Sequence, residues 1–384
     1  MEAATHRRIS ARFHEPVFCE GAPFSRARPD RPPDDPTTLD DATATPGTTH
    51  RPTPQTLSSP RKPRDGPGKG VPGSAMMIHD ALATAHTIAE RHNVPAEHVL
   101  PLPEGVANHV LALGEHLVLR VPRGPGFEAH LRKEAALVPL ARQAGVTTPA
   151  LVEFTDPPGG TPYMVLERVA GSDLVGTEPD TALLDRLGRE LARIHTVPVD
   201  GLVGLPRDSG VTDAGPLLER LLGSGHIDAE AADWLGAWCE HLSALVPTGA
   251  DPVLVHGDIA PQNLLVTPGK DLGGIVDWGD AAVADPAMDF AKLPPWWLPR
   301  VLNAYRSEGG EAIGQGWEAS VLWHHLTWAL GRLEDPAPQP GQRHWTAPPA
   351  SRLLGLLRLF ASNPSGPWAA LAPKGPAGGA AGRG

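Results

Sequence analysis

The chain has 384 residues, a formal net charge of −11 and only two cysteines, Cys19 and Cys239. The length is sufficient for two domains with a sizeable core, and the negative charge argues against a nucleic-acid-binding protein. The widely separated cysteines argue against a disulfide framework and fit a reducing cytoplasm, and no apolar run is long enough to span a bilayer.

Residues 1–75 are rich in Pro, Arg, Asp and Thr and contain few aromatic residues. Such a segment cannot bury enough apolar surface to offset its ordering entropy, so the sequence predicts a disordered leader. Met76-Met77 directly precedes the first periodic segment. We therefore expect the functional chain to start there, with the leader untranslated in the cell.

The next part of the chain alternates between helical and extended patterns. Apolar spacing predicts a helix over 78–92, a hairpin formed by 110–113 and 117–121, a helix over 128–143 and a strand over 163–166. We expect residues 76–168 to form a small strand-rich lobe.

Beyond Gly171 the apolar spacing becomes helical. It predicts helices over 183–195, 229–245, 317–333 and 351–360. We expect a larger helical lobe over 169–362, which makes the chain an α+β protein. The last residues, 363–384, are rich in Gly, Ala and Pro, and we expect a flexible tail.

Three oxygen-bearing side chains, Asp258, Asn263 and Asp277, follow one another at spacings of five and fourteen. Between the last two lie the apolar runs 264–266 and 274–276, joined by a Pro-Gly turn, which predicts a β-hairpin. Such a hairpin places Asn263 and Asp277 together at its open end. Two hard oxygen ligands beside a free carboxylate suit Mg²⁺-dependent phosphate chemistry.

This stretch, with His256-Gly257-Asp258 and the run 285–291, resembles the catalytic and metal-binding loops of the aminoglycoside phosphotransferase family. The resemblance covers roughly residues 80–335. It implies a protein-kinase-like bilobal fold, ATP and Mg²⁺ as cofactors, and a hydroxyl of a small molecule as the acceptor. It also implies that Asp258 is the catalytic base or orients the hydroxyl, and that Asn263 and Asp277 bind metal.

The resemblance also assigns the phosphate end of a nucleotide site. Gly105 and Asn108 lie in the loop before the first hairpin, where backbone N–H groups can cradle phosphate oxygens. Arg120 takes the place of the lysine that commonly binds the α- and β-phosphates, and Glu134 is its ion-pair partner. Arginine retains the charge of lysine but offers a planar fork of donors.

Residues 163–171 resemble a kinase hinge, an extended segment that follows a strand and contacts the adenine. By this resemblance Leu166 is the gatekeeper, Glu167 offers a backbone carbonyl, and Val169 offers a backbone amide. A plain buried strand produces a similar pattern.

Several conspicuous side chains near the motif are expected to have structural roles. By resemblance His256 braces the catalytic loop. Asp285 and Asp289 lie four residues apart near a helix start, and we expect them to brace the loop or the helix, with direct contact to the substrate as the alternative. The adjacent histidines at 324 and 325 lie in an apolar helix and have no metal-ligand spacing, so they are expected to be packed or to face polar groups.

The sequence leaves the acceptor open. Residues 169–362 hold thirteen Lys/Arg against twenty-five Asp/Glu, which favours a cationic substrate, although an acidic solvated surface explains the same count. Seven tryptophans follow residue 290; they indicate either core packing or a pocket for a bulky substrate such as a macrolide.

Two features run against the antibiotic classes. Macrolide kinases often have His at the position of Asn263, and no acidic residue follows Asp335 to bind an aminoglycoside. The preferred interpretation is an ATP-dependent phosphotransferase acting on an aminoglycoside- or macrolide-type antibiotic. Kinases of an amino alcohol, a sugar or homoserine, and a nucleotide-binding pseudoenzyme, are the alternatives. The oligomeric state and the use of GTP are not readable from the sequence.

Overall fold

The computed structural model describes residues 78–103, 106–199, 204–208, 213–247, 251–309, 316–335 and 349–374. The predicted leader, Gly105, and residues 375–384 of the predicted tail lie outside this part of the chain.

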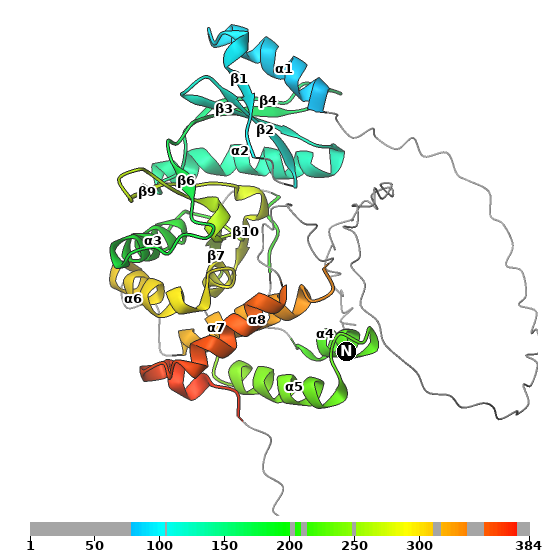
Figure 1. Ribbon diagram of the computed structural model, residues 1–384, viewed down its shortest axis with the longest axis vertical. Coiled ribbons are helices and arrows are strands. Elements are labelled where there is room, and N and C mark those ends of the chain that lie inside the picture. Colours follow the sequence, from blue (N-terminus) through cyan, green and yellow to red (C-terminus); the bar gives the residue numbers. More distant parts are fainter. Residues whose placement is uncertain are drawn as a thin grey trace, which may run out of the picture. The chain divides into compact units, whose positions relative to one another are not determined.

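The first half contains a five-stranded antiparallel sheet (Figure 1). Its strands follow the order β1-β2-β3-β5-β4, with bounds β1 (Val99–Pro101), β2 (Asn108–Leu113), β3 (Leu117–Pro122), β4 (Leu151–Thr155) and β5 (Tyr163–Glu167). The β2–β3 hairpin turns through Gly114, and Leu113 pairs with Leu117, as the alternation of apolar runs predicts.

Two helices accompany this sheet: α1 (Ile78–Arg91) and α2 (Glu128–Gln143). The buried alanines of α1 form a separate small core with Leu111, Leu119 and Val165 of the sheet. By contrast, Leu131 and Val138 of α2 belong to the main core, which continues into the second half of the chain. Helix α2 is therefore placed to link the sheet with the catalytic segments.

The second half is mainly helical. Its helices are α3 (Thr181–Ile194), α4 (Gly215–Gly223), α5 (Ala229–Ser243), α6 (Leu298–Gly309), α7 (Trp317–Gly331) and α8 (Pro349–Ala361). Helix α3 packs closely on α6, and α7 contacts both α5 and α8. The short strands are β6 (Ser172–Asp173), β7 (Val253–Val255), β8 (Leu264–Val266), β9 (Leu272–Ile275) and β10 (Ala282–Ala284). The α+β class and the bilobal order that the sequence predicts are confirmed.

Residues 167–171, which we call the hinge segment, lead from β5 to β6. At Gly171 the backbone has φ 148°, and an added Cβ would lie 2.1 Å from the carbonyl oxygen of Val266. Only glycine can occupy this position, because any side chain would collide with β8. The hinge segment is thus held against the hairpin of the predicted metal site.

All the predicted helices and hairpins are present, with ends shifted by a few residues at most. The structure adds the helices α4 and α6 and the strands β1, β4, β6, β7 and β10, of which β7 and β10 have three residues each. These two strands pair with each other, Val255 with Ala282, across a long stretch of sequence. A strand of three residues has too little periodicity to be recognised before its partner is known.

The prediction that the chain becomes flexible at residue 363 is wrong as far as Lys374. Residues Gly366–Leu371 form a short 3-10 helix, and Trp368 and Leu371 are buried in the main core. The indole N–H of Trp238 donates to the carbonyl of Leu371 at 2.9 Å. Two large apolar side chains outweigh the Gly/Ala/Pro composition because they find partners on other helices.

Within the described residues, no helix combines the length and the apolar character needed to cross a bilayer.

Candidate active site

The predicted hairpin forms from β8 and β9, with Leu264 paired with Ile275. The N–H of Val276 donates to the carbonyl of Asn263 at 3.0 Å, so Asn263 lies opposite Val276 and Asp277 follows directly. The register shifts near Val266, and β9 begins at Leu272, two residues earlier than predicted. Both candidate metal ligands nevertheless lie at the open end of the hairpin.

The catalytic loop follows β7 and turns sharply at Gly257, where φ is 79°. A Cβ at this position would lie 2.4 Å from the carbonyl oxygen of Asp280. The loop therefore approaches the turn after Asp277 more closely than any side chain would allow. This approach brings the segment that carries Asp258 beside the segment that carries Asp277.

Asp289 anchors this loop through backbone hydrogen bonds. Its two carboxylate oxygens accept the backbone N–H groups of His256, at 2.9 Å, and Gly257, at 2.7 Å. His195, which directly follows α3, adds a third contact to Asp289 at 3.1 Å. Burial alone would raise the pKa of Asp289, but the hydrogen bond from His195 and the contacts with His256 together hold this pKa below its usual range. The predicted bracing role of Asp289 is confirmed.

His256 is fully buried and also structural, as predicted. Its Nδ1 accepts the backbone N–H of Asp258 at 3.2 Å, and its ring lies 4.7 Å from the Trp278 ring. Burial lowers the pKa of His256, which keeps the ring neutral and Nδ1 able to accept.

The remaining polar residues near the motif are also structural. Asp285 caps the turn Pro286–Phe290 through the N–H of Ala287 and accepts from Ser320. His324 contacts Asp285, and His325 bonds to the carbonyl of Leu293. These contacts confirm that the two histidines are packed against polar partners.

Asp258 itself is nearly buried and has a different partner on each carboxylate oxygen. The Asn263 amide donates to Oδ2 at 2.6 Å and to the Asp258 carbonyl at 2.8 Å. The Lys292 ammonium lies 2.7 Å from Oδ1. Asp258 and Asn263 are thus brought into direct contact, as the predicted roles require, and Lys292 is a partner that the sequence analysis did not identify.

Arg120 joins the sheet to the catalytic segments. Its guanidinium donates to Glu134 of α2 at 2.5 Å and to Asp277 at 3.0 Å. Burial raises the pKa of Glu134 to about 7, against the attraction of Arg120. Desolvation would raise the pKa of Asp277 too, but the guanidinium holds it below its usual range. Asp277 therefore stays ionised beside a fixed cation.

Helix α2 also fixes the turn that follows Asp277. The Lys133 ammonium donates to the carbonyl of Ala281 at 2.9 Å. Asp277 itself has φ 72°, a left-handed conformation that is uncommon for residues other than glycine. Such strain persists only where the surroundings impose it, which is typical of functional positions.

The donors present suit a divalent cation bound together with a phosphate. Asp277 supplies a carboxylate, and the amide nitrogen of Asn263 is engaged by Asp258, so the Oδ1 oxygen is the group that Asn263 offers to a metal. No cluster of three His, Cys, Asp or Glu side chains that could hold a metal occurs in the described ranges. A site with two protein ligands is what Mg²⁺ uses when phosphate and water complete its coordination.

The residues predicted to bind the nucleotide lie in different surroundings. Asn108 opens β2 and is buried, and its Oδ1 has no hydrogen-bond partner. Leu166 is buried within β5. Gly105 lies outside the described residues.

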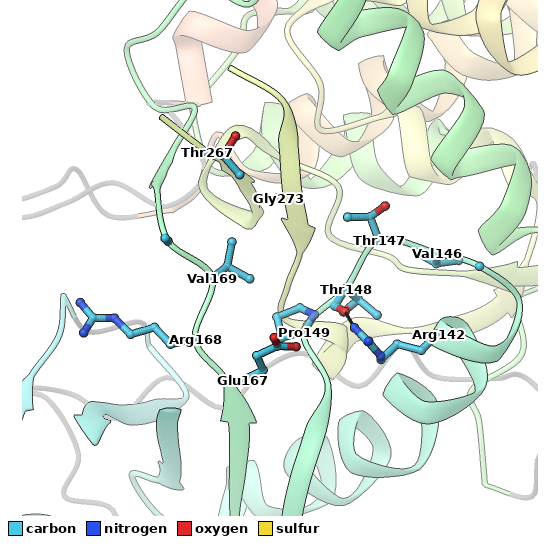
Figure 2. Close-up of a pocket in the computed structure, with 12 residues that line it drawn as sticks. Arg142, Val146, Thr147, Thr148, Pro149, Glu167, Arg168, Val169, Thr267 and Gly273 are labelled. Carbon is cyan, nitrogen blue, oxygen red and sulfur yellow. Dashed lines mark hydrogen bonds between the residues drawn. The ribbon is translucent and has the colours of Figure 1, made fainter. Parts of the chain in front are cut away.

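A pocket of about 530 Å³ lies beside the hinge segment (Figure 2). Glu167 and Val169 line it together with Thr147 and Thr148, and with Thr267 and Gly273 near the turn of the β8–β9 hairpin. Asn263 and Asp277, the candidate metal ligands, lie at the opposite end of that hairpin, and neither they nor Asp258 line this pocket.

Two cations beside Asp258, Lys292 and Arg352, carry no motif that identifies them, whereas Trp328 is one of the seven tryptophans expected to form either core packing or a substrate pocket. Arg352 of α8 donates to the carbonyl of Lys292 at 2.5 Å, and its guanidinium lies 4.5 Å from the centre of the Trp328 ring. Lys292 follows the recognised run 285–291 directly, which is a local signal that could have identified it. Arg352 offers no such signal, because it reaches the site only through the packing of α8 on α7.

Three features together define a kinase-like phosphotransferase. They are an antiparallel sheet whose helix α2 faces a helical lobe, the Arg120–Glu134 pair, and the set Asp258, Asn263 and Asp277. The chain belongs to the phosphotransferase enzyme family, whose model matches residues 98–323.

Two curated relatives and one solved structure show the extent of the similarity. An aminoglycoside 3'-phosphotransferase of Escherichia coli is 29% identical over 163 residues, which cover 38% of this chain and 57% of the relative. One from Streptomyces fradiae is 29% identical over 207 residues, covering 50% and 76%. The structure of an aminoglycoside 2'-phosphotransferase bound to GDP has a TM-score of 0.54 at 23% identity, covering 74% of this chain and 99% of that one. This structural likeness concerns the fold.

Proposed function

We propose that the protein transfers the γ-phosphoryl group of ATP to a hydroxyl of a small molecule, with Mg²⁺ as cofactor. The observation that carries the proposal is a pair of direct connections within the site. Arg120 connects Glu134 with Asp277, and Asp258 connects directly with Asn263. The relatives named for phosphoryl transfer to aminoglycosides support antibiotics as the first acceptors to examine.

Each residue has a task in this proposal. Arg120 would bind phosphate oxygens. Asp277 and Asn263 would hold Mg²⁺, and a bound Mg²⁺ would supply positive charge against that of the phosphates. Asp258 orients the acceptor hydroxyl toward the γ-phosphorus. The bond from the γ-phosphorus to the ADP oxygen breaks as the bond to the acceptor oxygen forms, and the acceptor proton passes to Asp258 or to water. Because the transition state is loose, positioning and charge neutralisation outweigh proton removal.

The proposal places the nucleotide between the sheet and the β8–β9 hairpin. Asn108, Leu166, Glu167 and Val169 would contact it there, together with Gly105. Since the reaction consumes ATP, we propose that the protein acts in the cytoplasm.

The test is nucleotide turnover with ATP and GTP against a panel of aminoglycosides, macrolides, amino alcohols, sugars and hydroxy acids, with products identified by mass spectrometry. We expect acceptor-dependent release of ADP and a product heavier by one phosphoryl group, both lost without Mg²⁺. Nucleotide binding with no transfer to any acceptor would contradict the proposal and favour a nucleotide-binding pseudoenzyme.

A further inference from the structure

The Asp258 carboxylate has two distinct sides. Its Oδ2 receives the amide of Asn263, which is on the side of the candidate metal ligands. Its Oδ1 faces the Lys292 ammonium at 2.7 Å. In an in-line transfer the acceptor and the leaving group lie on opposite sides of the phosphorus, so the acceptor approaches from the side away from the nucleotide. The Lys292 side is therefore the acceptor side.

A second cation lies beside Lys292 on this side. Arg352 is 6% exposed, and it donates to the carbonyl oxygen of Lys292. Trp328 joins the two, since the guanidinium of Arg352 lies 4.5 Å and the ammonium of Lys292 5.7 Å from its ring centre. The Lys292–Arg352 pair is thus built by three separate segments: the chain after Pro286–Phe290, α7 and α8.

The burial of this pair has an electrostatic consequence. The Lys292 side chain is 11% exposed, and burial lowers the pKa of Arg352 to about 10 while the carboxylate of Asp258 acts against that shift. In the part of the chain that the structure describes, Lys292 faces two carboxylates: Asp258 at 2.7 Å and the half-exposed Asp280 at 3.8 Å. The two cations therefore offset the negative charge beside Asp258, although the lobe as a whole is acidic.

A charged acceptor changes this balance. An ammonium placed at Asp258 would be a third cation in a partly desolvated space and would have to compete with Lys292 for Oδ1. An oxyanion would instead attract the Lys292 ammonium and the Arg352 guanidinium. Moving Lys292 toward the oxyanion would leave Oδ1 of Asp258 available to the acceptor hydroxyl. Arginine is especially suited to this task, because its planar fork matches carboxylate and phosphate.

We propose that the acceptor carries an oxyanion, a carboxylate or a phosphate ester, near the hydroxyl that is phosphorylated, and that Lys292 and Arg352 bind it. This proposal rests on the proposed function and narrows its substrate class. It makes polycationic aminoglycosides poor acceptors for this chain, unlike the relatives named for them.

The test compares acceptors that differ only in charge. The probes are γ-hydroxybutyrate, its neutral amide, the amino alcohol of equal length and hydroxypropyl phosphate, each as a short homologous series, with kanamycin as the polycation. We expect kcat/KM for the best oxyanion to exceed that for its neutral or cationic counterpart by about tenfold to a hundredfold, as is typical of hydrogen bonds to charged groups. The carboxylate and phosphate series separate the two oxyanions.

Variants connect the preference to the two cations. Lys292→Met and Arg352→Met should remove the preference, Lys292→Arg should keep most of it, and Lys292→Glu should shift it toward the amino alcohol. Arg358→Met is the matched control, because Arg358 is an exposed residue of the same helix that lies over Trp296 instead. Thermal unfolding of each variant identifies those that lose the fold.

Binding measured without turnover separates this proposal from the proposed function. Calorimetry with γ-hydroxybutyrate should show binding that Lys292→Met weakens, whether or not any acceptor is phosphorylated. Absence of transfer with this binding intact would overturn the proposed function only. Efficient phosphorylation of kanamycin, or a charge preference that Lys292→Glu leaves unchanged, would overturn the oxyanion proposal while leaving the phosphotransferase intact.

Discussion

Arg120 on β3 and Asp277 after β9 are joined by a hydrogen bond of 3.0 Å across 157 residues of sequence. Through the same guanidinium Arg120 also contacts Glu134 on α2. Arg120, a buried cation on the sheet, therefore orients the carboxylate of Asp277. The position of Asp277 thus depends on residues of both halves of the chain.

Arg120→Met should reduce both stability and catalysis. Its removal leaves Glu134 and Asp277 facing each other without a cation, and breaking a buried ion pair costs about 3–5 kcal/mol. We expect a lower urea midpoint and a KM for ATP raised by at least about tenfold, because the phosphates lose a charge-assisted donor. Both quantities are measured on the same preparation.

The double variant Arg120→Met/Glu134→Leu distinguishes the two effects. It should recover part of the stability, because it removes the unpaired buried carboxylate, but not the affinity for ATP. Arg132→Met is the control, since Arg132 forms exposed ion pairs with Asp156 and Glu128 that contribute about 1 kcal/mol or less. An unchanged KM for ATP in Arg120→Met would contradict the phosphate-binding role.

Asp258→Asn should lower kcat by about 10²- to 10⁴-fold, the range typical of a positioned acid–base group. Binding of ATP, measured by calorimetry, should change little, because Asp258 contacts Asn263 and Lys292 and not the Arg120 network. Asp271→Asn, an exposed position in the turn of the same hairpin, should leave kcat unaltered. Near wild-type turnover in Asp258→Asn would remove Asp258 from the mechanism.

Asp289→Asn should disturb the catalytic loop without touching substrate. The N–H groups of His256 and Gly257 face different oxygens of Asp289, so the NH₂ group of an asparagine would face one of them. That buried N–H is then left unpaired at a cost of about 1–3 kcal/mol. We expect a lower melting temperature and a reduced kcat, with the KM for ATP preserved. Asp285→Asn is the comparison, since Asp285 caps the same turn but does not contact the loop. Asp285→Asn should lower the melting temperature and leave kcat unchanged. Equal kcat values for Asp289→Asn and Asp285→Asn would refute the role of Asp289.

His325 should make the protein sensitive to mild acid. Burial lowers the pKa of His325 to about 4, from a usual value of 6.5. Because the unfolded chain binds the proton more readily, the folded state is favoured fully above pH 6.5 and loses this contribution as the pH falls toward 4. The loss approaches about 3 kcal/mol at the lower end of that range.

Urea unfolding near neutral pH and at about pH 5 tests this titration, with the expected decrease in stability following from the linkage relation. His325→Gln should reduce the difference between the two conditions, although it lowers stability in both. His86→Gln, an exposed position on α1, is the control. A pH dependence that is the same in His325→Gln and the wild type would assign the acid sensitivity to other groups.

Local patterns determined much of the active site. The Pro-Gly turn between two apolar runs predicted the β8–β9 hairpin, and this hairpin alone brings Asn263 and Asp277 to one end. The spacing of apolar residues likewise predicted α2 with its correct ends. Such features depend on residues near each other in the sequence, where turn chemistry and periodicity restrict the backbone to few conformations. The family resemblance, not this spacing, identified Glu134 as the partner of Arg120, and Glu134 is buried.

Features that depend on distant segments were decided by the tertiary structure. The tail packs with Trp368 and Leu371 in the main core, and the carbonyl of Leu371 accepts from Trp238 of α5, although the composition of the tail predicts fraying. The acidic composition of residues 169–362 suggested a cationic substrate, yet Lys292 and Arg352 meet beside Asp258. Residue counts average charge over a whole lobe, whereas the packing of α7 and α8 decides which few charges are desolvated together. The electrostatic energy between two charges decreases as their distance and the local dielectric constant increase. The local arrangement of charges therefore controls which acceptor the site can bind.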